Sequence, residues 1–105
     1  MELWEQRAAR NEALFREVNE RVALLAPEAE VEVGFVCECS DDACIERLRV
    51  ARAAYEAVRV HPRRFLVVPG HETAVERVVE RRAGYLVVEK QGSAGEIAER
   101  HHPRP

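Results

Sequence analysis

Three cysteines lie close together near the middle of this 105-residue chain, in the stretch FVCECSDDAC (residues 35–44), and the chain has no others. Their spacing is C-x-C-x4-C, formed by Cys37, Cys39 and Cys44. In an extended strand, side chains two residues apart point to the same side and lie about 6.6 Å apart, so Cys37 and Cys39 can reach one atom. The five-residue step to Cys44 returns the chain over them. Three thiolates and one further ligand make a tetrahedral zinc site.

The fourth ligand is predicted among the histidines, which are His61, His71, His101 and His102. His71 follows a Pro-Gly pair and precedes a predicted helix start at Thr73, so a loop held at both ends can direct it to a metal. His61 stands before Pro62, where a histidine suits the end of a helix, and the other two lie in the last five residues. The sequence therefore predicts one structural Zn2+ ion bound by Cys37, Cys39, Cys44 and His71.

Other states of the cysteines are compatible with the same spacing. The thiols can be reduced, with two of them in the core, because free cysteine is among the most buried residue types. They can serve redox or nucleophilic chemistry, hold an iron–sulfur cluster, or form a disulfide, for which Cys39 and Cys44 are the better-placed pair. The neighbouring acids are expected to raise the thiol pKa values, which disfavours a reactive thiolate and suits a site that attracts a dication: Glu38, Asp41 and Asp42.

A catalytic zinc is suggested by Glu72, which follows His71, because zinc deaminases pair their ligands with a nearby glutamate. Four protein ligands would close the coordination sphere, however, whereas a hydrolytic zinc keeps one position for water. The chain also has no phosphate-binding glycine loop, no G-x-S-x-G and no H-E-x-x-H. We therefore do not expect an enzyme.

The composition is that of a globular domain, 47% apolar and 33% charged, with a net charge of −3. No apolar run approaches the ~18 residues of a membrane span, and the segment MELWEQRAAR lacks the apolar core of a signal peptide. We expect a cytoplasmic protein without a membrane partner. In that compartment thiols stay reduced, and clustered cysteines favour a metal over a disulfide.

The charges are unevenly distributed. Residues 27–44 carry six acids and no base, whereas residues 45–64 carry six arginines and two acids. The two segments are expected either to form solvated surfaces that pair with each other or to present a basic face to an anionic partner such as nucleic acid. The net negative charge and the near absence of aromatic residues from 47–64, apart from Tyr55, disfavour nucleic acid.

Residues 2–25 are predicted to form one long helix ended by Pro27. Its apolar residues recur at steps of three and four, with Asn11 in the remaining slot. A helix of this length spans about 36 Å, roughly the width of a 105-residue domain. It either covers the sheet of its own chain or meets a partner at the end that carries Trp4, in which case we expect a homodimer with Trp4 and Phe15 at the interface. The stripe comprises Trp4, Ala8, Phe15, Val18, Val22 and Leu25.

The remaining elements predict one domain over residues 1–105. Strands are expected at 30–39, 45–50, 65–68 and 85–90, and helices at 51–58, at 74–82 behind a Thr73–Glu76 capping box, and shortly after Ser93. The fold class is α+β: a long N-terminal helix, a zinc-stabilised core over 30–92 with a small mixed four-stranded sheet pinned by zinc at one end, and a short helix with a loose tail over 93–105. In that sheet, strand 65–68 is expected to run parallel to strand 30–39 and to strand 85–90.

Four segments covering nearly the whole chain resemble a group of small actinobacterial proteins of unknown function: residues 10–22, 35–47, 54–72 and 75–90. The group has C-x-C, a third cysteine and P-G-H-E in this order, matching Cys37, Cys39, Cys44 and residues 69–72 here. This chain departs from the group at Val50, where a threonine helix cap is expected. The resemblance implies nothing about mechanism, because the group has no established activity.

The predicted function is a small zinc-stabilised regulatory or protein-interaction module without catalytic activity. Its partner is expected to be another protein, or a second copy bound through helix 2–25. The alternatives are a nucleic-acid-binding zinc domain that uses the arginines of 47–64, and a thiol-redox or metal-handling protein.

Overall fold

We describe the fold from a computed structural model, which covers the backbone of residues 3–41 and 43–104 and the side chains of residues 7–41 and 43–104. The elements follow in the order α1 (Leu3–Leu25), β1 (Glu32–Val36), β2 (Arg47–Ala51), α2 (Arg52–Arg59), β3 (Arg64–Val67), β4 (Glu76–Arg82), β5 (Tyr85–Lys90) and α3 (Gly92–Arg100). The α+β class is confirmed.

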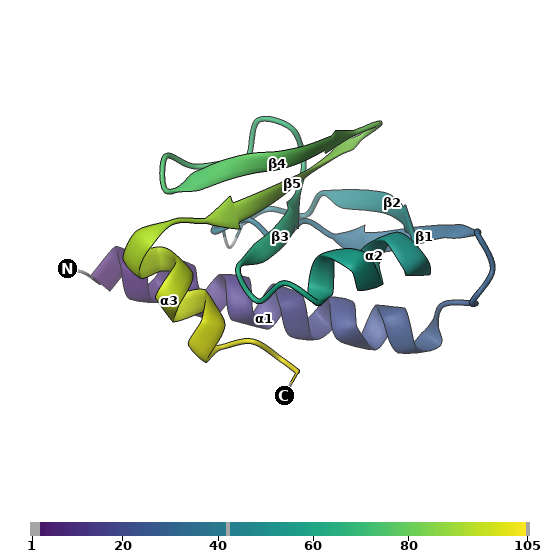
Figure 1. The fold of residues 1–105 in the computed structure, drawn as a ribbon, viewed down its shortest axis with the longest axis horizontal. Helices are drawn as coiled ribbons and strands as arrows, with labels where there is room; N and C mark the ends of the chain where they lie inside the picture. The colour runs from purple at the N-terminus through teal and green to yellow at the C-terminus, as the bar shows by residue number, and fades with distance from the viewer. Residues whose placement is uncertain (1–2, 42, 105) are drawn as a thin grey trace.

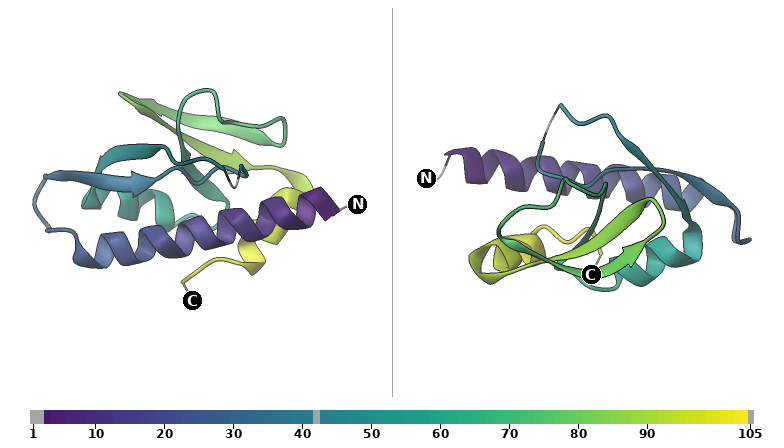
Figure 2. Two further views of the ribbon diagram at one scale, coloured as in Figure 1. Left: turned by 180° about the vertical axis from the view of Figure 1, so that it is seen from behind. Right: turned by 90° about the horizontal axis from the view of Figure 1, so that it is seen from above.

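The long helix α1 runs along one side of the molecule, and both sheets lie on the other side of it (Figures 1 and 2). Its 23 residues span about 35 Å, and the longest extent of the molecule is 43 Å. The helix contacts β1, α2 and α3, so it crosses the domain of its own chain. The predicted length is confirmed, whereas the predicted interface role of Trp4 concerns a side chain outside the described residues. No helix in the described part of the chain is long and apolar enough to cross a membrane.

The predicted mixed four-stranded sheet is wrong. The structure has two antiparallel sheets, a β1–β2 hairpin and a three-stranded sheet in the order β3-β5-β4. Strands β3 and β5, expected to be parallel, are antiparallel, with Phe65 opposite Val88. Strands β1 and β3 belong to different sheets. Just beyond the end of β1, a backbone hydrogen bond from Glu38 N to Leu66 O (2.7 Å) joins the two.

The helix predicted over 74–82 is also wrong, because this segment forms β4. Half of the capping box is present, since Thr73 N donates to Glu76 Oε1 at 2.8 Å, but the Thr73 hydroxyl has no partner. Adjacent valines fit a strand because successive side chains point to opposite faces. Val78 packs against the apolar cluster that contains Val88, and Val79 against the one that contains Val87. A β-bulge between Val78 and Glu80 follows.

The face of α1 that packs on the domain differs from the predicted apolar stripe. Val18 is 38% exposed and Leu25 is 88% exposed, and both point away from the core. The buried face instead carries mostly polar residues, Glu12, Arg16, Asn19 and Ala23. Of the predicted stripe, Val22 packs against a core cluster, so the stripe covers the domain only in part. Polar groups on other elements, rather than apolar side chains alone, satisfy the buried face.

Buried charges surround Phe65 at the centre of the fold. The guanidinium of Arg16 lies 4.4 Å from the ring centroid, Lys90 Nζ 5.2 Å and the Arg59 guanidinium 6.0 Å. Lys90 donates hydrogen bonds to Glu12 and Glu76, and Arg59 to Glu38. Three positive and three negative groups therefore compensate one another in this region. Compensation is needed because an unpaired buried charge is strongly destabilising.

The C-terminal tail is not loose as far as Arg104. Arg104 Nε donates to both carboxylate oxygens of Glu20 on α1 at 3.1 Å, and its Nη1 donates to Glu56 on α2 at 2.7 Å. Tyr55 donates to the same Glu20 carboxylate at 2.8 Å. These bonds join the tail to two helices.

Candidate metal centre

The structure brings together the four side chains predicted as metal ligands. The three thiol sulfurs and one ring nitrogen of His71 all lie within 4.8 Å of one another. His71 Nδ1 is 3.6 Å from the sulfurs of Cys37 and Cys44. A sulfur and a nitrogen ligand of one tetrahedral zinc, at about 2.3 and 2.0 Å, lie about 3.6 Å apart. The group can hold a metal ion, and it consists of Cys37, Cys39, Cys44 and His71.

Cys37 and Cys39 lie on an extended segment that continues β1. Cys37 N donates to Glu46 O at 3.1 Å, and Glu38 N donates to Leu66 O, so the backbone is held on both sides. Alternation along an extended chain points the two cysteines to one side and Glu38 to the other. Cys37 Sγ accepts a hydrogen bond from Val68 N at 3.2 Å. A bond of this kind orients a sulfur ligand and stabilises its negative charge.

A tight turn presents Cys44. Cys44 N donates to Asp41 O at 3.1 Å, and Ala43 N donates to the Asp41 carboxylate at 2.9 Å. The Asp41 side chain thus closes its own turn, as aspartate commonly does. Residue 42 lies outside the described part of the chain. The turn explains how a cysteine five residues beyond Cys39 returns to the same point.

A second turn, after β3, presents His71. His71 N donates to Val68 O at 2.9 Å, and Gly70 has a φ of +97°. Pro69 and Gly70 therefore occupy the central positions of a type II turn, in which proline suits the first position and glycine the second. The sequence P-G-H thus sets the direction of the histidine, although the predicted helix beyond it is a strand.

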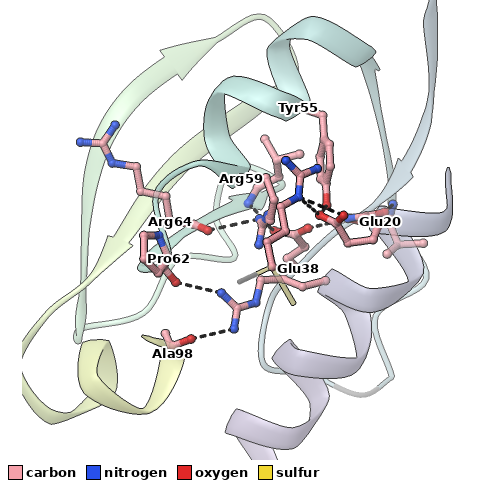
Figure 3. Close-up of polar contacts among 12 residues, drawn as sticks. Glu20, Glu38, Tyr55, Arg59, Pro62, Arg64 and Ala98 are labelled. Carbon is pink, nitrogen blue, oxygen red and sulfur yellow. Dashed lines mark hydrogen bonds and ion pairs between the residues drawn. The ribbon is translucent and has the colours of Figure 1, made fainter. Parts of the chain in front are cut away.

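Glu38, between the two strand cysteines, is fully buried and is the anchor of this segment (Figure 3). Its Oε1 accepts from Arg59 Nη2 at 2.9 Å and from Leu66 N at 3.0 Å, and its Oε2 accepts from Asn19 Nδ2 at 2.7 Å. Asn19 also exchanges two hydrogen bonds with the backbone of Val36, at 2.8 and 2.9 Å. Three elements, α1, α2 and β3, thereby fix the segment that carries Cys37 and Cys39.

Sequence reasoning grouped Glu38 with the surface acids and missed Asn19 and Arg59. One feature of the sequence indicates that Glu38 is buried. Two cysteines directed at a metal place the residue between them on the opposite side of the strand, and the long helix predicted next to that strand covers this side.

All three cysteines are free thiols in the structure, so the predicted alternative of a disulfide is not formed. Burial raises the pKa of Cys37, and the neighbouring cysteines Cys39 and Cys44 raise it further. Burial likewise raises the pKa of Cys39. For Cys37 and Cys39 the expected direction of the pKa shift is therefore correct, but its leading cause is burial rather than the acidic neighbours. Protonated thiols are poor nucleophiles, in contrast to those of redox-active cysteines.

Glu72, considered above as a partner of a catalytic metal, is exposed and serves the turn. Its Oε1 accepts from Gly70 N at 2.8 Å. Hydrogen bonds from the backbone N–H groups of Glu72 itself and of Gly70 hold the pKa of this carboxyl below its usual value. Of the other histidines, His61 is exposed in the turn after α2, and neither it nor His101 or His102 joins the thiols in the described part of the chain.

Comparisons with protein families, with curated proteins and with solved structures each gave no match to this chain.

Proposed function

We propose that this protein is a small zinc-stabilised interaction module, in which one Zn2+ ion bound by Cys37, Cys39, Cys44 and His71 holds the fold together and no reaction is catalysed. The observation that carries the proposal is the convergence of three thiols and one imidazole nitrogen within 4.8 Å.

Zinc is the metal that suits this set of donors. Thiolate and imidazole ligands in a four-coordinate group are characteristic of zinc, whereas carboxylate and carbonyl oxygens suit magnesium or calcium. The spacing of 3.6 Å between His71 Nδ1 and two sulfurs is already that of a tetrahedral site. Small thiol movements complete the coordination.

A structural role follows from the number of ligands and from their position. Four protein ligands leave no position for water on a tetrahedral zinc. The ion would join the loop between β1 and β2 to the loop between β3 and β4, and so cross-link the two sheets. These sheets already share one apolar cluster, in which Phe35, Leu48 and Val50 lie with Leu66, Tyr85 and Val87. At the end nearest the thiols they are joined by the backbone bond from Glu38 N to Leu66 O.

The interaction surface that we propose is the outer face of α1, opposite the side that packs on the domain. This face carries Leu14, Val18 and Leu25, of which Leu14 is 55% exposed. A helix that only covers its own domain normally has polar residues on its outer face. The seven-residue spacing of Asn11, Val18 and Leu25 extends back to Trp4 in the sequence. A second copy of this chain is the proposed occupant.

Charges on α1 favour an antiparallel arrangement of the two copies. If two antiparallel α1 helices pack through their outer faces and cross at the level of residue 19, Leu14 of one copy lies level with Leu24 of the other. Glu17 then lies level with Arg21 of the other copy. All four residues are exposed within one chain. Opposite charges at the edges of an apolar contact fix the orientation of paired helices.

The alternative of nucleic-acid binding through residues 47–64 is not favoured. Four of the six arginines in this segment are paired with glutamates: Arg52 with Glu56, Arg59 with Glu38, Arg63 with Glu99 and Arg64 with Glu89. Charges that are already compensated attract phosphate weakly.

The experiment on the metal compares two histidine variants by elemental analysis and by cobalt substitution, in which visible absorption reports tetrahedral thiolate coordination. The unaltered protein is expected to hold one zinc per chain. His71→Ala should lose zinc affinity by more than the ~10- to 100-fold that loss of a supporting residue costs. His61→Ala, which removes an exposed histidine, is the matched control and should retain the metal. Equal retention in both variants, or purified protein with three titratable thiols and no metal, would disprove the site.

A further inference from the structure

The β1–β2 hairpin (Figure 1) continues its register beyond the ends of its strands and into the thiol group. Just after the last strand pair, Cys37 donates from its backbone N–H to Glu46 O at 3.1 Å, as its place in the register requires. Continuing this register by two residues places Cys39 opposite Cys44. Their sulfurs lie within 4.8 Å of each other, in agreement with that position. Cys39 and Cys44 therefore form a cross-strand pair at the closed end of the hairpin.

Strand geometry suits a disulfide between Cys39 and Cys44 better than either other pairing. Residues directly opposite each other in an antiparallel pair have Cα atoms about 4.5 to 5.5 Å apart, and a disulfide needs about 4.4 to 6.8 Å. Cys37 and Cys39, two residues apart on one strand, are separated by about 6.6 Å, close to the upper limit. Cys37 and Cys44 are diagonal neighbours, at about 7 to 8 Å, which is beyond that limit.

Cys44 is also the thiol that is most accessible from solvent. Cys37 and Cys39 are 2% and 3% exposed, whereas Cys44 is half-buried. Its two neighbours in the chain are exposed, and one of them, Ile45, is 88% exposed. A small oxidant from solvent therefore reaches Cys44 first, and the sulfur of Cys39 lies next to it.

Cys37 is held more firmly than Cys39. The sulfur of Cys37 accepts a hydrogen bond from Val68 N at 3.2 Å and lies 3.6 Å from His71 Nδ1. The sulfur of Cys39 makes a weaker contact with the backbone, 4.0 Å from Asp41 O. Cys39 is thus freer than Cys37 to change its partner.

We propose that Cys39 and Cys44 are a site of reversible oxidation, at which a hydroperoxide converts two metal ligands into a disulfide and releases the zinc. This inference rests on the zinc site of the proposed function and adds a means of regulating it. A zinc-bound cysteine is a thiolate, which is the nucleophilic form of the side chain. Transient disulfides in reducing compartments commonly serve as redox sensors.

The reaction balances with hydrogen peroxide as the two-electron oxidant. The thiolate of Cys44 attacks one peroxide oxygen, the O–O bond breaks and hydroxide leaves, which gives a sulfenic acid at Cys44. The thiolate of Cys39 then attacks this sulfur, the S–O bond breaks, and a second hydroxide leaves as the S–S bond forms. Protons from solvent convert both hydroxides to water. The two cysteines are oxidised, and the peroxide is reduced.

Zinc release follows because the disulfide leaves only Cys37 and His71 as ligands, whereas a structural zinc is held by four. The cross-link between the loops of the two sheets is then lost, while the disulfide keeps the hairpin closed. A thiol reductant reverses the disulfide by exchange and lets zinc bind again.

Hydrogen peroxide added to the purified zinc-containing protein tests the proposal. Zinc release is followed with a chromophoric chelator against an untreated sample, and the disulfide is mapped by mass spectrometry of unreduced peptides. Cleavage after Glu38 and before Asp41 separates all three cysteines, so each pairing gives a distinct mass. We expect zinc release together with a link between Cys39 and Cys44, and renewed zinc binding after dithiothreitol and added zinc.

Two failures can be told apart in this experiment. Zinc that is retained under peroxide, or released with a different pairing, would overturn the inference and leave the metal site standing. Reduced protein that contains no zinc would disprove the proposed function, and the inference with it.

Cys37→Ser and Cys44→Ser form a matched pair, since each removes one thiol ligand of the metal. Under peroxide, Cys37→Ser should still form the disulfide between Cys39 and Cys44, whereas Cys44→Ser should keep two free thiols. A disulfide in Cys44→Ser but not in Cys37→Ser would overturn the proposed pairing. If either variant does not fold, the peptide map of the unaltered protein remains decisive.

Discussion

Glu38 shows how single residues determine this structure. A carboxylate with no exposure to water is stable here because both of its oxygens accept hydrogen bonds. The donors are Arg59, Asn19 and the backbone N–H of Leu66. Arg16 is the second buried guanidinium. Burial and, next, the nearby charge of Arg59 lower the pKa of Arg16 to about 10, so it is still charged at neutral pH. Glu38 is thus the main negative counterpart of two buried positive groups.

Glu38→Gln is expected to destabilise the metal-containing protein by about 3 to 5 kcal/mol, because it leaves Arg59 without its buried partner. The amide cannot avoid a clash of donors, since both carboxylate oxygens of Glu38 accept hydrogen bonds and one end of a glutamine is an NH2 group. Urea unfolding followed by circular dichroism measures the loss. Glu30→Gln, the same change in an exposed carboxylate away from the thiols and from His71, is the control and should unfold at the midpoint of the unaltered protein. Equal midpoints for the two variants would contradict the anchoring role of Glu38.

At the scale of elements, the sequence predicts best what depends on neighbouring residues. The long helix and the turns that present His71 and Cys44 follow from local patterns, and with them the four side chains that converge. The segment 76–82 could not be assigned from its valines, because apolar clusters lie on both faces of β4 and adjacent valines pack against different ones. The buried face of α1 could not be predicted either. Arg16 is buried because the carbonyl oxygens of Pro62 and Ala98 accept its hydrogen bonds, and these lie 46 and 82 residues away.

The turn after β3 gives a test at this scale. Gly70→Ala should lower zinc affinity and stability, because Gly70 has a φ of +97°, where a side chain costs about 1 to 2 kcal/mol. The strained turn would redirect His71. Gly34→Ala in β1 is the matched control, since an added Cβ meets no atom within 4 Å there and φ is not in the left-handed region. Competition with a chromophoric chelator measures both affinities. A Gly70→Ala protein that binds zinc as tightly as Gly34→Ala would show that the type II turn does not position the histidine.

At the scale of the whole molecule, three connections hold separate parts of the chain to one another. The tail is joined to α1 and α2 through Arg104, the two sheets are joined through Glu38, and the proposed zinc would join the loops at the end of each sheet. Structural zinc contributes about 10 to 16 kcal/mol in small peptides, which is comparable to the whole stability of a domain. A chelator is therefore expected to unfold the protein rather than merely loosen one loop.

The outer face of α1 is the remaining feature at this scale, and it makes the last prediction. Burying a valine is worth about 1.5 kcal/mol or more, and a symmetric dimer contains two copies of each change. Val18→Glu should therefore raise the dimer dissociation constant by about 100-fold or more, measured by sedimentation equilibrium, and leave zinc content unchanged. Ala53→Glu, at an exposed position on α2, should have no effect.

A charge exchange on α1 tests the proposed antiparallel arrangement itself. Glu17→Arg should weaken the dimer by placing it opposite Arg21 of the other copy, and adding Arg21→Glu should restore the pairing with the signs reversed. Neither residue has a hydrogen bond or ion pair within one chain among the described residues, so the monomer should keep its stability. Restored association in the double variant requires that residues 17 and 21 of different copies meet. A monomer at high micromolar concentration in the unaltered protein, or a double variant as weak as Glu17→Arg alone, would exclude this arrangement.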